Sequence, residues 1–152
     1  MPKKEPIDTS SFHGFIRNIR LKNDRHLRQA DVAEKLEMSL SFYSEIEKGY
    51  RRPLNAIEME IFAELFNLTE EEKTTMYDLA SYETNKIPVD LEYIMDGENG
   101  KWARTALRKA KEVNADEKMW KKFIWDLEKK QNSNKGGEAD DKDEYNESGP
   151  EQ

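Results

Sequence analysis

With 152 residues and a net charge of −7, the chain can hold one modest domain, or a small domain and a satellite, but cannot bind nucleic acid through its overall charge. It has no cysteine, which excludes disulfides and thiolate metal sites and fits a reducing cytoplasm. No apolar run approaches the roughly 18 residues that a membrane helix needs, and the first residues lack the apolar core of a signal peptide, so we expect a soluble cytoplasmic protein with no membrane partner.

The acidic excess is unevenly distributed. Residues 1–55 contain 11 basic against 8 acidic residues, a net charge of +3. Residues 56–88 contain 2 against 8, residues 89–130 contain 10 against 9, and residues 131–152 contain 2 against 7. Because DNA responds to a local basic face rather than to the total charge, the amino-terminal part remains a candidate DNA-binding region.

Residues 1–10 carry two prolines and no hydrophobic periodicity, which predicts a flexible arm. Ser10 or Ser11 then occupies the N-cap position of a helix that continues to about Lys22. Apolar residues recur along it at i, i+3, i+4 and i+7, as in an amphipathic helix with one buried face. These residues are Phe12, Phe15, Ile16 and Ile19.

Residues 27–53 predict two short helices, at about residues 28–36 and 40–48, joined by a tight turn. Ser39 is placed to cap the second helix, and Gly49 is placed to end it in the left-handed conformation. A three-residue turn between two short helices is the geometry of a DNA-binding helix-turn-helix. The apolar seam shared by the two helices comprises Val32, Ala33, Leu36, Tyr43 and Ile46.

Residues 12–68 resemble the Cro/phage-repressor (XRE-like) helix-turn-helix family of small bacterial and phage DNA-binding regulators. Spacing, apolar pattern and flanking helices agree with the family together. The resemblance implies an all-α fold, a five-helix repressor-like domain and double-stranded DNA as the partner. The matching residues are Arg20, Leu27, Gln29, Val32, Ala33, Leu36, Ser39, Ser41, Tyr43, Ser44, Ile46, Glu47, Gly49, Arg52 and Pro53.

The resemblance also implies roles for individual residues. Arg20 would pair with Glu47 and brace the first helix against the recognition helix. Positions that commonly face bases in the family match Leu40, Ser41, Ser44 and Glu45. Phosphate contacts are implied for Arg28, Gln29, Tyr50, Arg51 and Arg52.

Two positions depart from the family pattern. The segment between Arg20 and Leu27 is longer than usual, so the first helix or the following loop must be extended. Glu37 occupies a turn position where the backbone is left-handed and glycine is usual, at a cost of about 1 kcal/mol. We therefore expect a slightly reshaped turn and a re-aimed recognition helix.

The predicted base-facing residues form an unusual set. Leu40 can offer only an apolar contact, for example to a thymine methyl group, and Ser41 can donate or accept. Glu45 can accept from a cytosine amine but is repelled by phosphate. No position in the set offers an arginine for guanine or a glutamine for adenine. The sequence therefore leaves open a helix-turn-helix that docks on protein or has degenerate affinity for DNA.

Two further helices complete the predicted domain, residues 11–84. The first spans residues 55–66, and the second follows a capping box of Thr69 and Glu72 and continues to about Tyr82. The helix at residues 55–66 would turn an acidic face away from DNA. Its predicted core residues are Ile57, Ile61, Phe62, Leu65 and Phe66, and its predicted exposed acids are Glu58, Glu60 and Glu64.

After a linker, residues 88–130 predict a helical carboxy-terminal segment, with helices at about residues 89–95, 101–113 and 116–130. Two or three short helices rarely form a stable domain alone. We therefore expect this segment either to pack within the chain or to form a homodimer interface that lets two half-sites be bound. Trp125 would point away from the core stripe of the last helix as a candidate partner surface. The stripe is Trp120, Phe123, Ile124 and Leu127.

Residues 131–152 are rich in Asn, Gly, Asp, Glu and Ser, which predicts a disordered acidic tail. The chain offers no cysteine nucleophile, no glycine-rich phosphate loop and only two isolated histidines, so we expect no enzyme and no cofactor. The loop at residues 96–100 lacks the spacing of a calcium loop, and no metal site is expected.

Two functions remain open. The first is a sequence-specific DNA-binding transcriptional regulator, expected to be a homodimeric repressor, that reads the major groove with helix 40–48. The second is a protein-interaction module built on a helix-turn-helix, such as an antitoxin-like or phage-defence inhibitor. Such a module would bind a protein partner through its acidic helices or Trp125.

Overall fold

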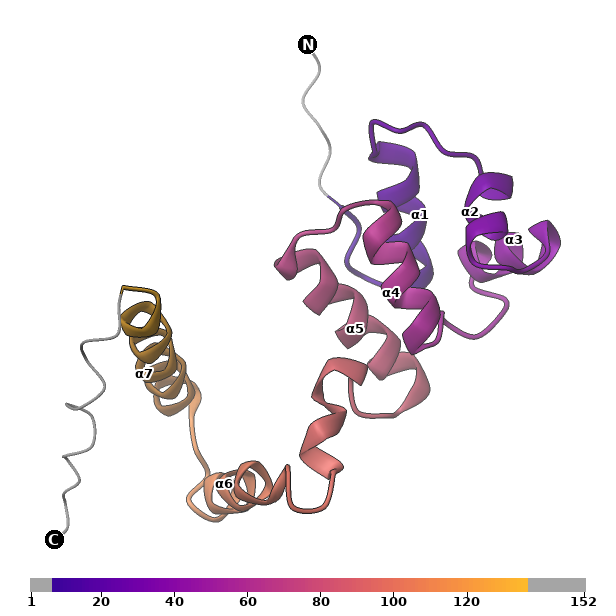
Figure 1. Ribbon diagram of the computed structural model, residues 1–152. Coiled ribbons are helices and arrows are strands. Elements are labelled where there is room, and N and C mark those ends of the chain that lie inside the picture. The colour runs from indigo at the N-terminus through magenta and orange to yellow at the C-terminus, as the bar shows by residue number, and fades with distance from the viewer. Residues whose placement is uncertain (1–6, 137–152) are drawn as a thin grey trace, which may run out of the picture. The chain divides into compact units, whose positions relative to one another are not determined.

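The computed structural model describes residues 7–136, which are helical or loop throughout, with no strand among them. The predicted all-α fold class is therefore confirmed for this part of the chain. Part of the predicted arm, residues 1–6, and most of the predicted tail, residues 137–152, lie outside it. The chain divides after Asn99 into two compact units. The first contains α1 (Phe12–Lys22), α2 (Gln29–Lys35), α3 (Leu40–Lys48), α4 (Ala56–Leu65), α5 (Glu70–Thr84) and the 3₁₀ helix η1 (Val89–Met95) (Figure 1).

Four helices of the first unit, α1, α3, α4 and α5, begin at a residue whose side chain caps them. Ser11 and Ser39 both accept a hydrogen bond, at 3.1 Å, from the backbone N–H three residues further on. Thr69 does the same at 3.1 Å, and the Glu72 carboxylate accepts from the Thr69 N–H at 2.9 Å, so this capping box is closed as predicted. Asn55 caps α4 in the same reciprocal way.

The core of the first unit lies where α1 packs against α3 and α5 (Figure 1). The second helix packs on α3, and α4 packs on α5. Helices this short are held by burial of an apolar face rather than by their own propensity. All of the apolar residues predicted for the first helix and for the seam between α2 and α3 are buried. The largest of the fully buried side chains are Tyr43, Phe12, Phe15, Phe62, Ile16, Ile46, Met59 and Met76.

The predicted buried face of α4 is partly wrong. Ile57, expected in the core, is 69% exposed, whereas Met59 and Ala63 are buried. Apolar residues occur on nearly every side of this helix, so its sequence alone does not fix which side faces inward. The choice is made by tertiary packing, including Leu54 and Leu68, which are buried just before and just after the helix.

The extended connection between α1 and α2 binds the carboxy-terminal end of α4. Arg25 donates from Nη1 to the backbone carbonyl of Leu65 at 2.8 Å, and Asn23 donates from Nδ2 to the carbonyl of Phe66 at 3.5 Å. The last turn of α4 contains no basic residue of its own. A cation at the negative end of a helix is favourable. The longer loop therefore supplies, through Arg25, the basic side chain that the last turn of α4 does not contain.

The second unit contains α6 (Lys101–Glu112) and α7 (Glu117–Gly136), and Asp116 accepts from the Met119 N–H at 2.9 Å to cap α7. Residues 131–136, which the sequence places in a disordered tail, continue α7 instead, because nothing before Gly136 breaks the helix. The predicted core stripe of α7 is not buried. Its members, and Trp125 on the other side, are 38–54% exposed, since two helices alone cannot cover such a stripe.

The division between units falls later than the boundary that the composition suggests. Thr84 ends α5, and Asn85 adopts the left-handed conformation at φ 57°. The following η1 packs on α5 and so belongs to the first unit. Within the described part of the chain, no helix is both long enough and apolar enough to cross a bilayer.

Candidate nucleic-acid interface

Helices α2 and α3 are joined by a turn whose backbone is set by Glu37. This residue has φ 59°, the left-handed value expected from its position, although it is not glycine. Gly49 ends α3 at φ 85°, and a Cβ added there would lie 2.8 Å from the His13 ring of α1. Both ends of α3 are therefore fixed, one by a capped turn and the other by close packing on α1.

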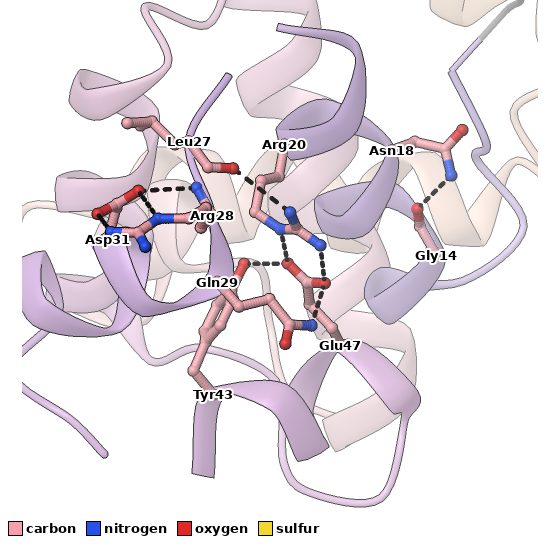
Figure 2. A network of polar contacts seen from close by, with 9 residues as sticks. All are labelled: Gly14, Asn18, Arg20, Leu27, Arg28, Gln29, Asp31, Tyr43 and Glu47. Carbon is pink, nitrogen blue, oxygen red and sulfur yellow. Dashed lines mark hydrogen bonds and ion pairs between the residues drawn. The ribbon is translucent and has the colours of Figure 1, made fainter. Parts of the chain in front are cut away.

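The inner side of α3 is anchored by one buried carboxylate, that of Glu47, which is 2% exposed (Figure 2). Arg20 of α1 donates to it twice, from Nε to Oε2 at 2.7 Å and from Nη2 to Oε1 at 2.9 Å. Gln29 of α2 donates from Nε2 to Oε1 at 2.9 Å, and Tyr43 donates its hydroxyl to Oε2 at 2.5 Å. A single group thus ties α1, α2 and α3 together.

The charge state of this network follows from its geometry. Burial raises the pKa of the Glu47 carboxyl, but the hydrogen bonds from Arg20, Tyr43 and Gln29 outweigh burial, so its net pKa lies below the usual value. The bond to Glu47 raises the pKa of Arg20. Burial, and then the adjacent Glu47 charge, raise the pKa of Tyr43, which therefore remains a donor at neutral pH. The pair is charged, and both Glu47 oxygens and all three guanidinium nitrogens of Arg20 form hydrogen bonds.

The outer side of α3 carries the residues predicted to face bases. Leu40 is 51% exposed and Ser41 is exposed, while Ser44 and Glu45 are half-buried. All four lie on the first half of the helix or near its middle, away from the core residues Tyr43 and Ile46. The structure therefore brings the predicted set together on one accessible side.

Two arginines follow α3 and stack on the same aromatic ring. The guanidinium carbon of Arg51 lies 5.0 Å from the centroid of the Phe42 ring, and that of Arg52 lies 5.5 Å from it. Arg51 also donates from Nε to Glu45 at 2.6 Å, whereas Arg52 pairs with Glu58 of α4 at 2.8 Å. The ring of Phe42 thus packs against both arginines of the loop that follows α3.

Residues 16–73 match the model of a family described as helix-turn-helix. This part of the chain is an XRE/Cro-type helix-turn-helix domain. Neither the curated proteins nor the solved structures gave a match to the chain. The matched range contains α2, the turn, α3 and α4, together with most of α1 and the start of α5. The family is one of DNA-binding domains, and the residues around α3 are its candidate nucleic-acid interface.

The helix-turn-helix domain holds the other predicted phosphate-contacting residues in two different ways. Tyr50 is 74% exposed beyond the end of α3. Arg28 is exposed at the start of α2 and donates from Nη2 to Asp31 at 3.0 Å. Gln29 is half-buried and already bonds Glu47. Arg28 and Tyr50 are accessible as they stand, while Gln29 has only its second amide N–H to offer.

Several partners in the helix-turn-helix domain carry no recognisable signal in the sequence. Gln29 and Tyr43 join the Glu47 network from different helices. Glu58 caps the start of α4 and also pairs with Arg52, so it is not simply one of the acids on the exposed face of α4. Burial raises the pKa of Glu58, but the hydrogen bonds from Arg52 and from the Asn55 backbone lower it by more, so its net pKa is below the usual value.

Proposed function

We propose that the chain is a sequence-specific DNA-binding transcriptional regulator that reads the major groove with α3. The main support is the way α3 is held, with its inner side fixed through Glu47 and its outer side open at Leu40 and Ser41. A helix braced in this way can present a constant set of side chains to base edges. Rigid presentation of this kind favours a sequence reader over a non-specific cationic surface.

The base-reading residues in this proposal belong to the outer side of α3. The amino-terminal residues of a recognition helix reach the bases, and Leu40 and Ser41 occupy that end. Leu40 would contact a thymine methyl group and Ser41 would donate to or accept from a base edge. Ser44, one turn further on, completes the set, and Glu45 lies beside it with its carboxylate paired to Arg51.

Phosphate contacts in the proposal flank that set. Tyr50 and Arg52 would contact the backbone beyond the end of α3, and Arg28 and Gln29 would contact it at the start of α2. Arg52 is charged, and its bond to Glu58 raises its pKa further. These contacts would fix the register of the domain on the duplex without reading sequence.

The proposed functional form is a homodimer that represses transcription. Helices α6 and α7 leave apolar side chains exposed, and a second copy would cover them. A two-fold dimer would place two copies of α3 one helical turn of DNA apart and so bind an inverted repeat. Occupation of a promoter by such a dimer would exclude polymerase, which makes repression the expected output.

Selection of binding sites from random duplex DNA, at two salt concentrations, tests this function. We expect enrichment of an inverted repeat whose half-sites lie about ten base pairs apart. The Ser41→Ala variant is expected to change the selected sequence. Arg52→Ala is expected to weaken binding to every sequence and to lower the salt slope by about one.

Featureless binding that disappears at roughly 0.2 M salt would contradict the proposal, because it would leave only the phosphate contribution. Unchanged site preference in Ser41→Ala would contradict the assignment of α3 as the reading helix. Thermal melting of each variant, followed by circular dichroism, checks that the exposed substitution has left the fold intact.

A second function, a helix-turn-helix that binds a protein partner, is favoured by one observation. Trp125 is 54% exposed, with the Lys129 ammonium 4.5 Å from its ring centroid. Exposed tryptophans of this kind are common in protein interfaces. If this function is the relevant one, Trp125→Ala abolishes activity in the cell, whereas Ser41→Ala and Arg52→Ala leave it intact.

A further inference from the structure

Arg51 folds back along α3 instead of continuing the direction of the loop. Its Nε donates to the Glu45 carboxylate at 2.6 Å, and its guanidinium lies over the ring of Phe42. Phe42 and Glu45 are three residues apart and so are neighbours on one side of the helix. The guanidinium of Arg51 therefore lies on the outer side of α3, near the residues proposed to read bases.

The free end of this guanidinium points to a ligand with two acceptors. Arg51 forms one side-chain hydrogen bond within the described part of the chain, through its Nε, and its terminal Nη1 and Nη2 have no hydrogen-bond partner there. The Arg51 side chain is 50% exposed. The neighbouring Arg52 differs, because its Nη1 and Nη2 both bond Glu58, at 2.8 and 3.2 Å, and Nη1 also bonds the Pro53 carbonyl. Of the two arginines, Arg51 is the one whose fork of terminal N–H groups is open.

We infer that Arg51 reads a guanine in each half-site, and that Glu45 and Phe42 are positioning residues that hold its guanidinium toward the major groove. Guanine presents O6 and N7 there as paired acceptors, which match the two terminal N–H groups of an arginine. A guanidinium held by an ion pair and an aromatic face loses less conformational freedom on binding than an unrestrained one. This inference rests on the proposed function and assigns part of its specificity.

The inference also accounts for the presence of Glu45 on a surface that approaches DNA. A lone carboxylate there would be repelled by phosphate. Paired with Arg51 it is compensated, and its role becomes orientation of the cation. The sequence predicts a phosphate contact for Arg51 because the residue follows the recognition helix. The contacts with Glu45 and Phe42 instead carry its guanidinium back toward the base-reading side.

The test compares Arg51→Lys with wild type by site selection and by competition binding at one salt concentration. Lysine keeps the charge but lacks the fork, so affinity for non-specific DNA and the salt slope should stay near wild type. Discrimination for guanine at one fixed position of each half-site should fall by roughly 5- to 150-fold. Arg52→Lys is the matched control, and it should change affinity for all sequences by one common factor while leaving base preferences in place.

Three results would overturn the inference. One is a guanine preference that survives in Arg51→Lys. Another is an Arg51→Ala variant that binds every sequence more weakly by the same factor, with a salt slope lower by about one, as expected for a phosphate contact. The third is wild-type protein that binds no duplex, which would remove the proposed function as well.

A double-mutant cycle tests the role assigned to Glu45. Glu45→Gln should weaken guanine discrimination at the same position as Arg51→Lys, and the double variant should lose little more than either single variant. Additive losses, or loss of preference at a different base pair in Glu45→Gln, would show that Glu45 reads a base independently and does not orient Arg51. Because both side chains are partly exposed, these variants are expected to fold, which melting curves can verify.

Discussion

At the scale of single residues, Glu47 shows how one buried charge can determine the position of a whole helix. Its two carboxylate oxygens accept four hydrogen bonds, from Arg20, Gln29 and Tyr43, with Arg20 bonding both oxygens. A buried ion pair of this kind is costly to break, because removal of one partner leaves the other poorly compensated. The orientation of α3 therefore depends on a charge on its buried side, away from the residues proposed to read bases.

The Glu47 network makes stability depend on pH in a defined direction. The pKa of Glu47 is lower in the folded state, so the stabilisation it provides is complete above its unfolded value of about 4.3 and is lost as pH falls through the folded value. We expect Glu47→Gln to lower the free energy of unfolding at pH 7 by roughly 3 kcal/mol or more. Urea unfolding at pH 7 and at lower pH measures the difference, which should shrink on acidification; a constant difference would contradict this account.

The left-handed backbone of Glu37 offers a stabilising substitution. An L-residue at φ 59° is strained by about 1–2 kcal/mol, while glycine increases the conformational entropy of the unfolded chain. Glu37→Gly is therefore expected to raise the free energy of unfolding by up to about 1 kcal/mol. Glu34→Gly, at an exposed position in the last turn of α2, is the matched control and should lower it by up to about 1 kcal/mol. Chemical denaturation measures the free energy of unfolding of both variants. If both are less stable than wild type, Glu37 is not strained.

Much of the site could be predicted at this scale, and the remainder has a physical explanation. The approach of Arg20 to Glu47 follows from the resemblance to a family, since the two residues are far apart in sequence. Gln29 and Tyr43 could not be added to the network, because their side chains reach Glu47 only once three helices have packed. The same holds for Arg51, whose contact with Phe42 and Glu45 requires the chain to reverse after Gly49.

At the scale of helices, caps and spacing predict the ends of α1, α3 and α5 well, because these depend on local hydrogen bonds. The orientation of α4 about its axis is not local. Apolar residues are spread around it, and tertiary packing selects Met59 over Ile57 for burial. Charged residues also have uses that spacing does not reveal, as in the binding of Arg25 to the end of α4.

The orientation of α4 can be checked by paired truncations. Met59→Ala removes a buried side chain and should lower the free energy of unfolding by about 2–5 kcal/mol. Ile57→Ala removes an exposed one and should change it by less than about 0.5 kcal/mol. Equal losses in urea denaturation would indicate that Ile57 is buried after all.

At the scale of the whole molecule, the described part of the second unit is a pair of helices, α6 and α7, with no buried apolar residue. A groove of about 240 Å³ lies between α6 and α7, lined by apolar residues that include Ala110, Val113 and Phe123. The sequence predicts helices here and an apolar stripe, but an apolar stripe looks the same whether it meets the same chain or another copy. Partner choice therefore could not be predicted.

The proposed dimer can be tested through α7. Phe123→Ser combined with Ile124→Ser removes two exposed apolar side chains, and we expect this variant to sediment as a monomer at concentrations where wild type is a dimer. Lys121→Ser, on the same helix, should leave the dimer in place. Analytical ultracentrifugation over a dilution series measures both, and a wild-type monomer would contradict the dimer.

The contrast between the two ends of the first unit has a consequence for kinetics. Glu70, Glu71 and Glu72 open α5 on the side of the unit away from α3, while Arg51 and Arg52 follow α3 (Figure 1). Arg51 and Arg52 are paired with Glu45 and Glu58, so the asymmetry rests on the totals, 11 basic against 8 acidic residues in residues 1–55 and 2 against 8 in residues 56–88. We therefore expect an electric dipole moment whose positive end lies on the side of α1 to α3. In the field of a duplex such a dipole experiences a torque, which would turn α3 toward the groove before the first contact forms. Acidic residues that never touch DNA would thus raise the rate of productive encounter, and salt would reduce that rate far more than the rate of release.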